Sequence, residues 1–432
     1  MDIFKNIEIR RSNNIPLLID KNKNVYLSDI IKSERSFLKN IRSGDVVILI
    51  GDFDELSIST FLYLINIKAI IAPLTKANIT DIERNIETIK ADYIVEQDKV
   101  TKLKKKSTSN NLIEDLKKKR NPGLILFSTG TTGKPKAILH DTTILFKRFE
   151  TPRPALKAIN FLMFDHAGGI NTLLHIIFNG GTIINPEKRS PKYILELINK
   201  YSIELLPTTP TFLRMLLMSG MIPKDVPQCL KIITYGSEQM DEVTLQTLSN
   251  LLPSIDFRQT YGLSEFSVFR VKSKSKNSLF FKIGGEGLET KIIENTLHLK
   301  SKFRMMGYLN APDPFDQDGW YNTKDIVEYD GEYIKIIGRD TDIVNVGGLK
   351  FMLSEVESVA FKFPKVSNVK SIAKSNPITG QHVEILIEMI EKTDKDLLNL
   401  ELHFKENLPS HMRPQKIKIG QIKVNHRFKK IN

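Results

Sequence analysis

The chain has 432 residues, of which 41% are hydrophobic and 26% are charged, and this composition is typical of a globular protein. Its single cysteine, Cys229, excludes an intramolecular disulfide and a cysteine-rich metal site. No apolar run approaches the about 18 residues that a membrane-spanning helix needs, and charges interrupt the N-terminal region where a secretion signal has its apolar core. We therefore expect a cytoplasmic protein with no membrane span, and the length favours about two or three domains.

The formal net charge of +13 at pH 7 points to nucleic acid as one class of partner. The basic residues are nevertheless spread along the chain, and the densest runs, 102–106 and 117–120, are typical of a solvated face. A basic protein also attracts nucleotides, coenzyme A and acidic carrier proteins. We therefore expect acidic small molecules or a carrier protein as partners, and no nucleic acid.

In the N-terminal part, segments with helical spacing alternate with short apolar runs. Residues 27–41 and 57–67 predict helices, and the runs 46–50 and 69–74 predict buried strands. Such an alternation of strands and helices favours a parallel sheet that is covered by helices on both faces.

The same alternation continues along the rest of the chain. The further segments are predicted strands at 124–127, 205–208, 230–235, 288–299, 332–337 and 383–389, and predicted helices at 193–200, 211–219, from 354 and at 394–406. The fold class that we predict is α/β. Residues 1–338 would form a large N-terminal domain of mostly parallel sheets covered by helices, and residues 339–432 a small α+β C-terminal domain.

The most informative stretch is residues 127–141, which directly follow an apolar run. Its glycines let the backbone approach a ligand, while hydroxyl groups, backbone N–H groups and two lysines supply donors and positive charge. That combination favours a bound polyphosphate over a plain surface turn, although no Ser or Thr follows a Gly-Lys pair as in the GxxxxGK[ST] loop. The candidate phosphate-binding residues are Ser128, Thr129, Gly130, Thr131, Thr132, Gly133, Lys134 and Lys136.

This loop resembles the phosphate loop of adenylate-forming enzymes, the superfamily of acyl-CoA synthetases, luciferases and peptide-synthetase adenylation domains. Other segments match the family's pattern in order, at residues 235–238, 259–265, 304–310, 321–325, 338–340 and 428–431. The resemblance implies a ligase that uses ATP and Mg²⁺, with a mobile C-terminal domain. It also implies coenzyme A or the phosphopantetheine of a carrier protein as the thiol acceptor.

The resemblance assigns the adenine pocket to two of these segments. Gly236, Ser237 and Glu238 form a turn that would line the pocket with backbone groups, although an ordinary strand-to-helix turn is an equally good interpretation of that segment alone. In the segment Gln-Thr-Tyr-Gly-Leu-Ser-Glu, Tyr261 would stack on the adenine ring.

The same resemblance places the phosphates, the metal and the ribose. Ser264 would contact the α-phosphate, and Glu265 would bind Mg²⁺, a hard cation that prefers carboxylate oxygens. Asp325 would accept hydrogen bonds from both ribose hydroxyls, and Arg339 would bind ribose or phosphate at the hinge. Lys324 stands where the family has glycine, so the local turn need not follow the family.

The resemblance places the catalytic lysine near the end of the chain. Lys430 is the best match, and its ammonium would neutralise charge between the attacking carboxylate and the α-phosphate. The chain departs from the family at Lys429 and Ala137, where glycines are usual, and at Thr341, where the hinge pivot is usually Asp or Lys. Residues 345–350 resemble the segment that lines the thiol tunnel, with a simple glycine turn between strands as the alternative.

Residues 164–169, Phe-Asp-His-Ala-Gly-Gly, align with the family's acyl-pocket segment, and we assign substrate binding to Asp165, His166 and Gly168. In amino-acid-activating domains an Asp at this place pairs with the substrate's amino group. Alternatively, His166 donates a hydrogen bond to Asp165, because a buried carboxylate needs a partner. The glycine pair favours close packing or an open pocket.

Together these assignments predict an AMP-forming acid–thiol ligase for a small carboxylic acid, with Lys430, Ser264 and Glu265 in catalysis. Two alternatives remain. One is an amino-acid activator that loads a peptidyl or acyl carrier protein, which Asp165 favours. The other is a non-catalytic nucleotide-binding relative, which the net charge and the altered glycines favour.

Overall fold

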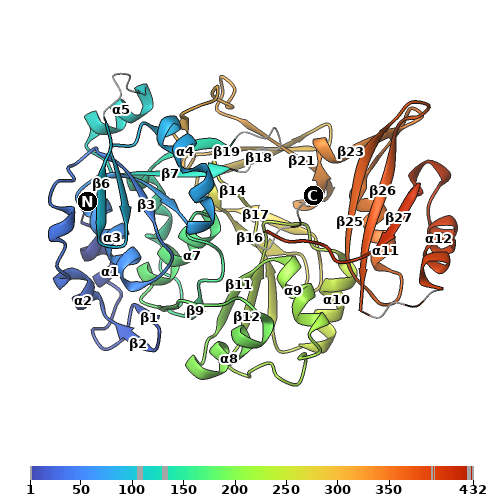
Figure 1. The fold of residues 1–432 in the computed structure, drawn as a ribbon, viewed down its shortest axis with the longest axis horizontal. Helices are drawn as coiled ribbons and strands as arrows, with labels where there is room; N and C mark the ends of the chain where they lie inside the picture. The colour runs from blue at the N-terminus through green and yellow to red at the C-terminus, as the bar shows by residue number, and fades with distance from the viewer. Residues whose placement is uncertain are drawn as a thin grey trace.

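The computed structural model describes residues 2–104, 110–128, 135–390, 393, 395–425 and 430. Figure 1 shows an elongated molecule in which the elements before residue 340, coloured from blue through yellow to light orange, form the larger part, and the darker orange and red elements after residue 343 stand at one end. Two seven-stranded sheets, a six-stranded sheet and a five-stranded sheet form the framework of the described residues. Helices pack beside the first two sheets, which confirms the predicted α/β class.

The first seven-stranded sheet carries both ends of the predicted phosphate loop. In spatial order its strands are β20 (Gly307–Tyr308), β8 (Lys136–Asp141), β7 (Gly123–Ser128), β4 (Ile70–Leu74), β3 (Val46–Ile50), β5 (Tyr93–Glu96) and β6 (Lys99–Lys102). The central strands β7, β4, β3 and β5 pair in parallel. All five residues of β3 are buried, because helices cover both faces of a parallel sheet, and this explains the unbroken apolar run in the sequence.

The second seven-stranded sheet brings several loop ends to one edge. Its strands, in spatial order, are β13 (Asp256–Gln259), β12 (Ile232–Tyr235), β11 (Leu205–Thr208), β9 (Lys157–Ile159), β10 (Thr182–Ile184), β1 (Leu18–Asp20) and β2 (Lys23–Val25). All pairs are parallel except β1 with β2. The segments 235–238 and 259–265 therefore leave neighbouring strands at the same edge, where ligands of open α/β sheets bind.

A six-stranded antiparallel sheet follows, which the sequence did not predict. Its strands are β16 (Arg270–Ser273), β17 (Phe281–Gly284), β22 (Tyr333–Arg339), β21 (Tyr321–Asp330), β19 (Thr296–Ser301) and β18 (Leu288–Ile293), and a small hairpin of β14 (Gly262–Leu263) and β15 (Ser267–Val268) precedes it. The single strand predicted at 288–299 was wrong. Glu294 and Asn295 both have positive φ, 48° and 60°, and turn the chain into a hairpin.

The C-terminal sheet has a hydrophobic core of its own, built from residues after 343. It consists of β24 (Leu349–Met352), β23 (Ile343–Val346), β26 (Gly380–Met389), β25 (Val366–Asn376) and β27 (Lys416–Ile419), with helices α11 (Leu353–Phe361) and α12 (Asp396–Asn407) beside it. A short 3-10 helix, η4 (Asp340–Asp342), connects it to β22. The predicted boundary between residues 338 and 339 lies at the end of β22, whose last residue is Arg339.

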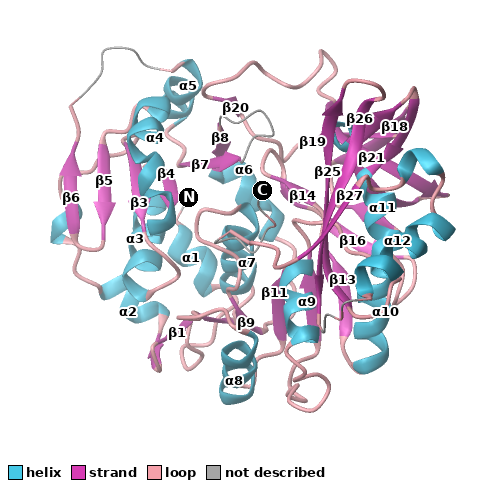
Figure 2. Ribbon diagram, turned by 45° about the vertical axis from the view of Figure 1, so that its right-hand side comes forward, coloured by secondary structure: helices cyan, strands magenta, loops and turns pink. Residues whose placement is uncertain are grey.

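The remaining helices pack on the first two sheets, except η5 (Ser410–Met412), whose Met412 is part of the C-terminal core, and Figure 2 shows α3 and α4 beside β3 and β4. They are α1 (Ile3–Glu8), α2 (Leu27–Lys32), η1 (Ser36–Leu38), α3 (Glu55–Asn66), η2 (Lys76–Asp81), α4 (Ile82–Ile89), α5 (Asn111–Lys119), α6 (Thr142–Phe146), η3 (Lys147–Phe149), α7 (Ala167–Phe178), α8 (Pro191–Tyr201), α9 (Pro210–Met218), α10 (Glu242–Leu251) and η5. The helix predicted at 27–41 was too long, because Ser33 takes the extended ψ of 127° and ends α2. Within the described ranges, no helix is both long and apolar enough to cross a membrane.

Candidate active site

A cavity of about 980 Å³ lies where the sheets of the larger part meet. Most of the predicted site residues that the structure describes line it, and they come from segments far apart in the sequence. They are Ser128, Lys136, Asp165, His166, Gly168, Gly236, Ser237, Ser264, Glu265 and Arg339. Glu238, Tyr261, Asp325 and Lys430 do not line the cavity. Thr129, Gly130, Thr131, Thr132, Gly133 and Lys134 lie outside the described residues.

The two ends of the phosphate loop are paired across a hairpin. Ser128, the last residue of β7, lies opposite Lys136, the first residue of β8. The side chain of Asn310 holds the exit of the loop, because its Oδ1 accepts the N–H of Ala137 at 2.9 Å and its Nδ2 donates to the Pro135 carbonyl at 3.0 Å. Ala137 is fully buried and pairs in the strand, so its methyl group leaves the hairpin intact.

Two side chains from other elements hold the segment that carries Ser264 and Glu265. The Nε2–H of His140, in β8, donates to the Ser264 carbonyl at 2.7 Å. The hydroxyl of Tyr308, in β20, donates to Oε1 of Glu265 at 2.7 Å. The ammonium of Lys136 lies 4.6 Å from the centre of the Tyr308 ring, so the phosphate-loop lysine and the candidate metal carboxylate share one neighbour.

Burial shifts the pKa of both partner side chains. Burial lowers the pKa of His140 to about 4, so its imidazole is neutral near pH 7. Burial, with the adjacent Glu265 carboxylate, raises the pKa of the Tyr308 phenol. The hydroxyl of Tyr308 therefore stays protonated and remains a donor to Glu265.

Asp325, a buried carboxylate, connects Tyr261 to Arg339. Its Oδ2 accepts the Tyr261 hydroxyl at 2.7 Å, and its Oδ1 accepts Nε–H of Arg339 at 3.1 Å. The Tyr261 ring packs between Phe269 and Phe281, with ring centres 6.1 and 6.0 Å away. The structure thus places Tyr261 in the core behind the cavity, whereas the guanidinium of Arg339 reaches the cavity wall.

At Lys324 the backbone has the left-handed conformation that a glycine would adopt in this turn. Lys324 has a φ of 65°, in the left-handed region that glycine adopts at least cost. Its N–H donates to Oδ1 of Asn322 at 2.8 Å, and its ammonium pairs with Asp340 at 3.3 Å. The replacement therefore preserves the turn and adds a cation at the cavity wall.

The turn after β12 allows two strand ends to approach closely. A Cβ atom at Gly236 would lie 2.2 Å from Oγ1 of Thr260, so only glycine fits. Ser237 follows with a φ of 69°. Glu238 points elsewhere: its Oε2 accepts from the N–H and hydroxyl of Thr211, at 3.1 and 2.6 Å, at the start of α9. Only the backbone groups of Glu238, and not its carboxylate, could therefore line the predicted adenine pocket.

The predicted acid segment forms the start of α7. Nδ1 of His166 accepts the N–H of Gly168 at 3.0 Å and caps the helix. A Cβ atom at Gly169 would lie 2.2 Å from the Met163 carbonyl oxygen, which supports the expected close packing. Asp165 is 3% exposed and lines the cavity beside them.

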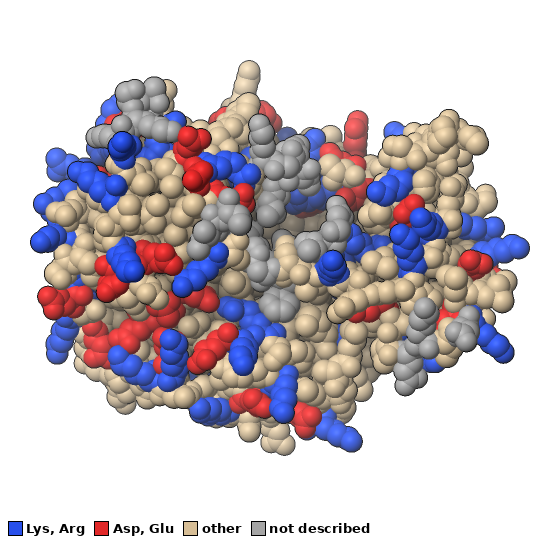
Figure 3. Space-filling view, viewed as in Figure 1, with Lys and Arg blue, Asp and Glu red and all other residues tan. Residues whose placement is uncertain are grey.

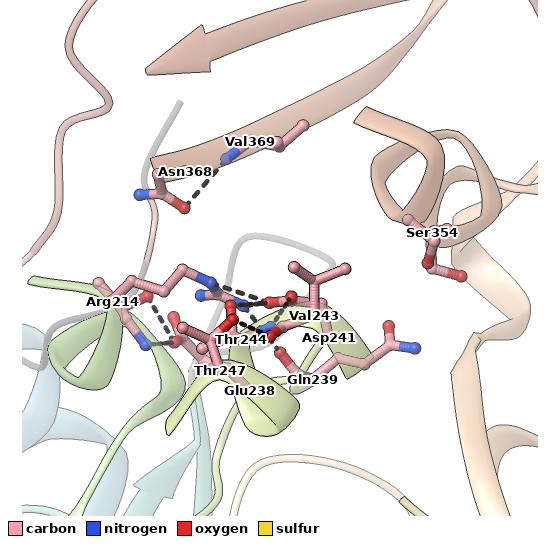
Figure 4. Close-up of polar contacts among 12 residues, drawn as sticks. Arg214, Glu238, Gln239, Asp241, Val243, Thr244, Thr247, Ser354, Asn368 and Val369 are labelled. Carbon is pink, nitrogen blue, oxygen red and sulfur yellow. Dashed lines mark hydrogen bonds and ion pairs between the residues drawn. The ribbon is translucent and has the colours of Figure 1, made fainter. Parts of the chain in front are cut away.

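Lys430 lies between the larger part and the C-terminal sheet. Its ammonium donates to the Val369 carbonyl at 2.5 Å and lies 5.8 Å from the centre of the Phe361 ring. The Arg214 guanidinium lies 5.0 Å from the same ring. Figure 4 shows Arg214 paired with Asp241 on the larger part, facing the strand that carries Val369. Burial lowers the pKa of Lys430.

Residues 345–350 form the hairpin turn between β23 and β24, with φ of 60° at Gly347 and 90° at Gly348. None of these residues lines the cavity. The geometry in this structure is that of a glycine turn between strands.

The sequence interpretation missed three residues that organise the site, His140, Asn310 and Tyr308. Each acts through a partner more than 40 positions away, and no local pattern marks such a pair. All three residues lie inside the matched segments 127–141 and 304–310, but the sequence assigned no role to them there.

No cluster of three or more metal-ligating side chains occurs among the described residues. Glu265 alone offers a carboxylate oxygen in the predicted metal position. This donor set fits a Mg²⁺ ion that takes most of its ligands from phosphates and water. Figure 3 shows Lys and Arg side chains mixed with Asp and Glu over the viewed face, as the sequence predicted for its basic residues.

The sequence matches one family model, that of the AMP-binding enzymes, over residues 44–292. The 2-succinylbenzoate–CoA ligase of Staphylococcus epidermidis is 26% identical over 317 residues, which cover 68% of this chain and 64% of that protein. The phenylacetyl-CoA ligase epaB of Aspergillus niger is 26% identical over 275 residues, which cover 56% of this chain and 51% of that protein. The chain thus spans between 51% and 64% of the length of these two curated relatives.

Among solved structures, ATP-bound MatB from Rhodopseudomonas palustris is similar with a TM-score of 0.81 and 16% identity, over 99% of this chain and 96% of that one. At this level of identity the likeness establishes the fold alone. It confirms the two-part α/β architecture.

Proposed function

Because the chain belongs to the AMP-binding enzyme family, we propose that it activates a small carboxylic acid with ATP, forming an acyl-adenylate and pyrophosphate. The acyl group would then pass to the thiol of coenzyme A or of a carrier-protein phosphopantetheine, with release of AMP. The observation that carries the proposal is the convergence of the phosphate-loop ends, the Ser264–Glu265 segment, Arg339 and the start of α7 on one cavity. The CoA ligases among the relatives favour coenzyme A.

In the proposed first step, a carboxylate oxygen of the acid attacks the α-phosphorus, and the bond to the bridging oxygen of pyrophosphate breaks. Ser128 and Lys136 would hold the departing phosphates, and Ser264 the α-phosphate. Glu265 would hold Mg²⁺, which would supply positive charge that offsets the negative charge of the phosphates. Tyr308 would fix the orientation of the Glu265 carboxylate through the hydrogen bond described above.

Asp325 and Arg339 would bind the ribose as a pair. The two carboxylate oxygens of Asp325 already accept from Tyr261 and Arg339, and each oxygen has a further lone pair for a ribose hydroxyl. Binding would therefore require Arg339 to move aside or to share Asp325 with the sugar. The turn of Gly236 and Ser237 would offer backbone groups to the adenine.

We place Lys430 in the first step, although it contacts Val369 in this structure. The predicted C-terminal domain, residues 339–432, would rotate about η4 to bring the lysine to the cavity. Its enclosed ammonium has a lowered pKa because of burial, so release into a phosphate-rich cavity would favour the charged form.

The test is ATP–pyrophosphate exchange with a panel of aryl, fatty and amino acids. Exchange that depends on an aryl or fatty acid and on Mg²⁺ supports the proposal. Coenzyme A added in a second assay should give the matching thioester. No exchange with any acid, in a protein that still binds ATP, would favour the non-catalytic alternative.

A second candidate is amino-acid activation, and the buried Asp165 at the cavity wall favours it. Exchange with amino acids alone would replace the preferred proposal with this one. In that case Asp165→Asn should abolish exchange, because the carboxylate would no longer meet the substrate's ammonium group.

The lysine assignment has its own test. Lys430→Ala should lower exchange by about 100-fold or more, the scale of a lost transition-state contact. Lys423→Ala is the matched control, because Lys423 is exposed in the same C-terminal segment. Equal activity of both variants would remove Lys430 from the mechanism.

A further inference from the structure

The cavity continues well past the predicted acid segment. Gly168, Thr172, His175 and Asn179 all line it, and their spacing of three and four residues puts them on one face of α7 and its C-cap. At about 1.5 Å per residue, this face is about 16 Å long. The cavity therefore extends along the helix, and we call the part beside His175 and Asn179, at the C-terminal end of α7, its far end.

The far end of the cavity gathers positive charge. Arg153 and Arg270 both line it there, next to His175. Each arginine lowers the pKa of His175, after the larger effect of burial, and Arg153 also lowers the pKa of Arg270. These effects place the two arginines and the neutral imidazole of His175 within electrostatic range of one another. Both arginines are exposed, so water and salt screen their repulsion, and a bound anion would be attracted to both.

One carboxylate, Glu286, also lines this part of the cavity. Its charge raises the pKa of Arg270, but its Oε1 accepts a hydrogen bond from the Lys302 ammonium at 2.5 Å and not from an arginine. For the guanidinium groups of Arg153 and Arg270, no ion pair or hydrogen bond is found among the described residues. A third arginine, Arg148, donates to the carbonyls of Phe266 and Val268 and is fixed by the backbone.

Apolar side chains also line the cavity, beside polar ones such as Thr208 and Thr234. They include Leu156, Leu205, Ile232 and Phe269. These side chains suit a hydrocarbon or aryl spacer, because apolar surface gains free energy when another apolar surface displaces water from it. An acid that fills the cavity would place its reacting carboxylate near Ser264 and its other end at the arginines.

We propose that the acid substrate carries a second anionic group, held by Arg153 and Arg270 at the far end of the cavity. This inference rests on the proposed function and narrows its substrate to acids with an apolar middle and an anionic tail. Guanidinium groups bind carboxylate, sulfonate or phosphate oxygens in pairs of hydrogen bonds. The free guanidinium donors of Arg153 and Arg270 supply such contacts.

The experiment compares α,ω-dicarboxylic acids of increasing length with their own monomethyl esters in ATP–pyrophosphate exchange. The ester keeps the carbon chain of the acid and replaces the distal charge with a neutral group that is one methyl larger. We expect a diacid of matching length to exceed its ester by about 10- to 100-fold in kcat/KM, the scale of charge-assisted hydrogen bonds. The variant with both Arg153→Gln and Arg270→Gln should abolish that preference, so that a diacid and its ester give the same kcat/KM.

Arg42→Gln is the matched control, because Arg42 is exposed and lies outside the cavity. Equal use of diacids and esters would overturn the inference while leaving the proposed function intact. So would a double variant that keeps the diacid preference in exchange but needs more coenzyme A in the thioester assay, because the arginines would then bind the phosphates of coenzyme A. Exchange with no acid at all would contradict the proposed function itself, and the inference with it.

Discussion

The Nε2–H of His140 donates to the carbonyl of Ser264 at 2.7 Å, although 124 positions separate the two residues. This bond connects the strand that leaves the predicted phosphate loop to the segment that carries the predicted metal ligand. His140 is 2% exposed, so the bond is shielded from water. The position of Ser264 and Glu265 thus depends on an imidazole within the stretch 127–141 to which the sequence assigned no role.

The burial of His140 predicts a loss of stability in mild acid. Burial lowers its pKa to about 4, whereas the unfolded chain has a pKa of about 6.5. Between these pH values His140 binds a proton in the unfolded state but not in the native state. The free energy of unfolding therefore falls as the pH falls. The contribution of His140 to stability is complete above about pH 6.5. By about pH 4, protonation of this one group has lowered the free energy of unfolding by about 3 kcal/mol.

Denaturant unfolding of the wild type and of His140→Gln, at several pH values in this window, measures the effect. The variant keeps an N–H donor but does not titrate, so the stability difference between the two proteins should change by about 1 kcal/mol per pH unit. His175 and His298 also have lowered pKa values, but they are present in both proteins and cancel in the comparison. A constant difference across the window would contradict the prediction.

The second prediction concerns the buried carboxylate of Asp325. Asp325→Asn leaves one acceptor oxygen for two donors, Tyr261 and Arg339, so one donor loses its partner. The free energy of unfolding should fall by about 1–3 kcal/mol, and the KM for ATP should rise by about 10- to 100-fold. Unfolding curves and exchange kinetics measure the two effects separately.

Asp330→Asn is its control. Asp330 lies at the exposed end of the same strand and pairs with Lys274 on the surface. An exposed ion pair contributes less than about 1 kcal/mol, so both stability and the KM for ATP should stay near the wild-type values. A normal KM for ATP in Asp325→Asn would exclude Asp325 from the ribose site.

The third prediction concerns the metal. Tyr308→Phe removes the hydroxyl that fixes Oε1 of Glu265 but keeps the ring beside Lys136. The concentration of Mg²⁺ for half-maximal exchange should rise about tenfold, as for other residues that orient a metal ligand. Tyr329→Phe, at an exposed position in β21, should leave it unchanged. An unchanged Mg²⁺ requirement in Tyr308→Phe, with a loss of stability alone, would mean that the hydroxyl only supports the fold.

The sequence predicted features that are set by neighbouring residues. The apolar runs gave the buried parallel strands, and the strand at 46–50 agrees with β3 at both ends. The prediction failed where one or two turn residues decide the structure. Glu294 and Asn295 adopt positive φ and split a predicted strand, and Ser33 ends a predicted helix, because hydrophobic spacing carries no information on backbone turns.

In the candidate site, too, the sequence predicted local features but not contacts between distant residues. The motif residues that line the cavity could be identified from local patterns, whereas the residues that hold them could not. His140 and Tyr308 reach the site through the pairing of β8 with β20, and Arg270 reaches it from β16 of the six-stranded sheet, relationships set by the tertiary fold. Tyr261 was expected to face a ligand, and the structure puts its ring between Phe269 and Phe281.

The last prediction separates the two glycines at the start of α7. A Cβ atom at Gly169 would lie 2.2 Å from the Met163 carbonyl oxygen, and backbone cannot yield without moving the helix. A Cβ atom at Gly168 would meet chiefly the tip of the Leu162 side chain, at 2.7 Å, which can swing away. Gly169→Ala should therefore lower the free energy of unfolding by about 2 kcal/mol or more. Gly168→Ala should lower it less, because alanine also stabilises a helix relative to glycine by up to about 1 kcal/mol.

The displaced Leu162 tip has a consequence for activity. Leu162 lines the cavity, so Gly168→Ala should narrow the acid end and lower exchange with bulky acids more than with small ones. Unfolding curves of both variants, and exchange of Gly168→Ala with a bulky and a small acid, measure these effects. If Gly169→Ala is as stable as the wild type, the start of α7 can shift to accept the methyl group. Separately, if Gly168→Ala loses the same fraction of its exchange activity with the bulky and the small acid, Gly168 does not border the acid.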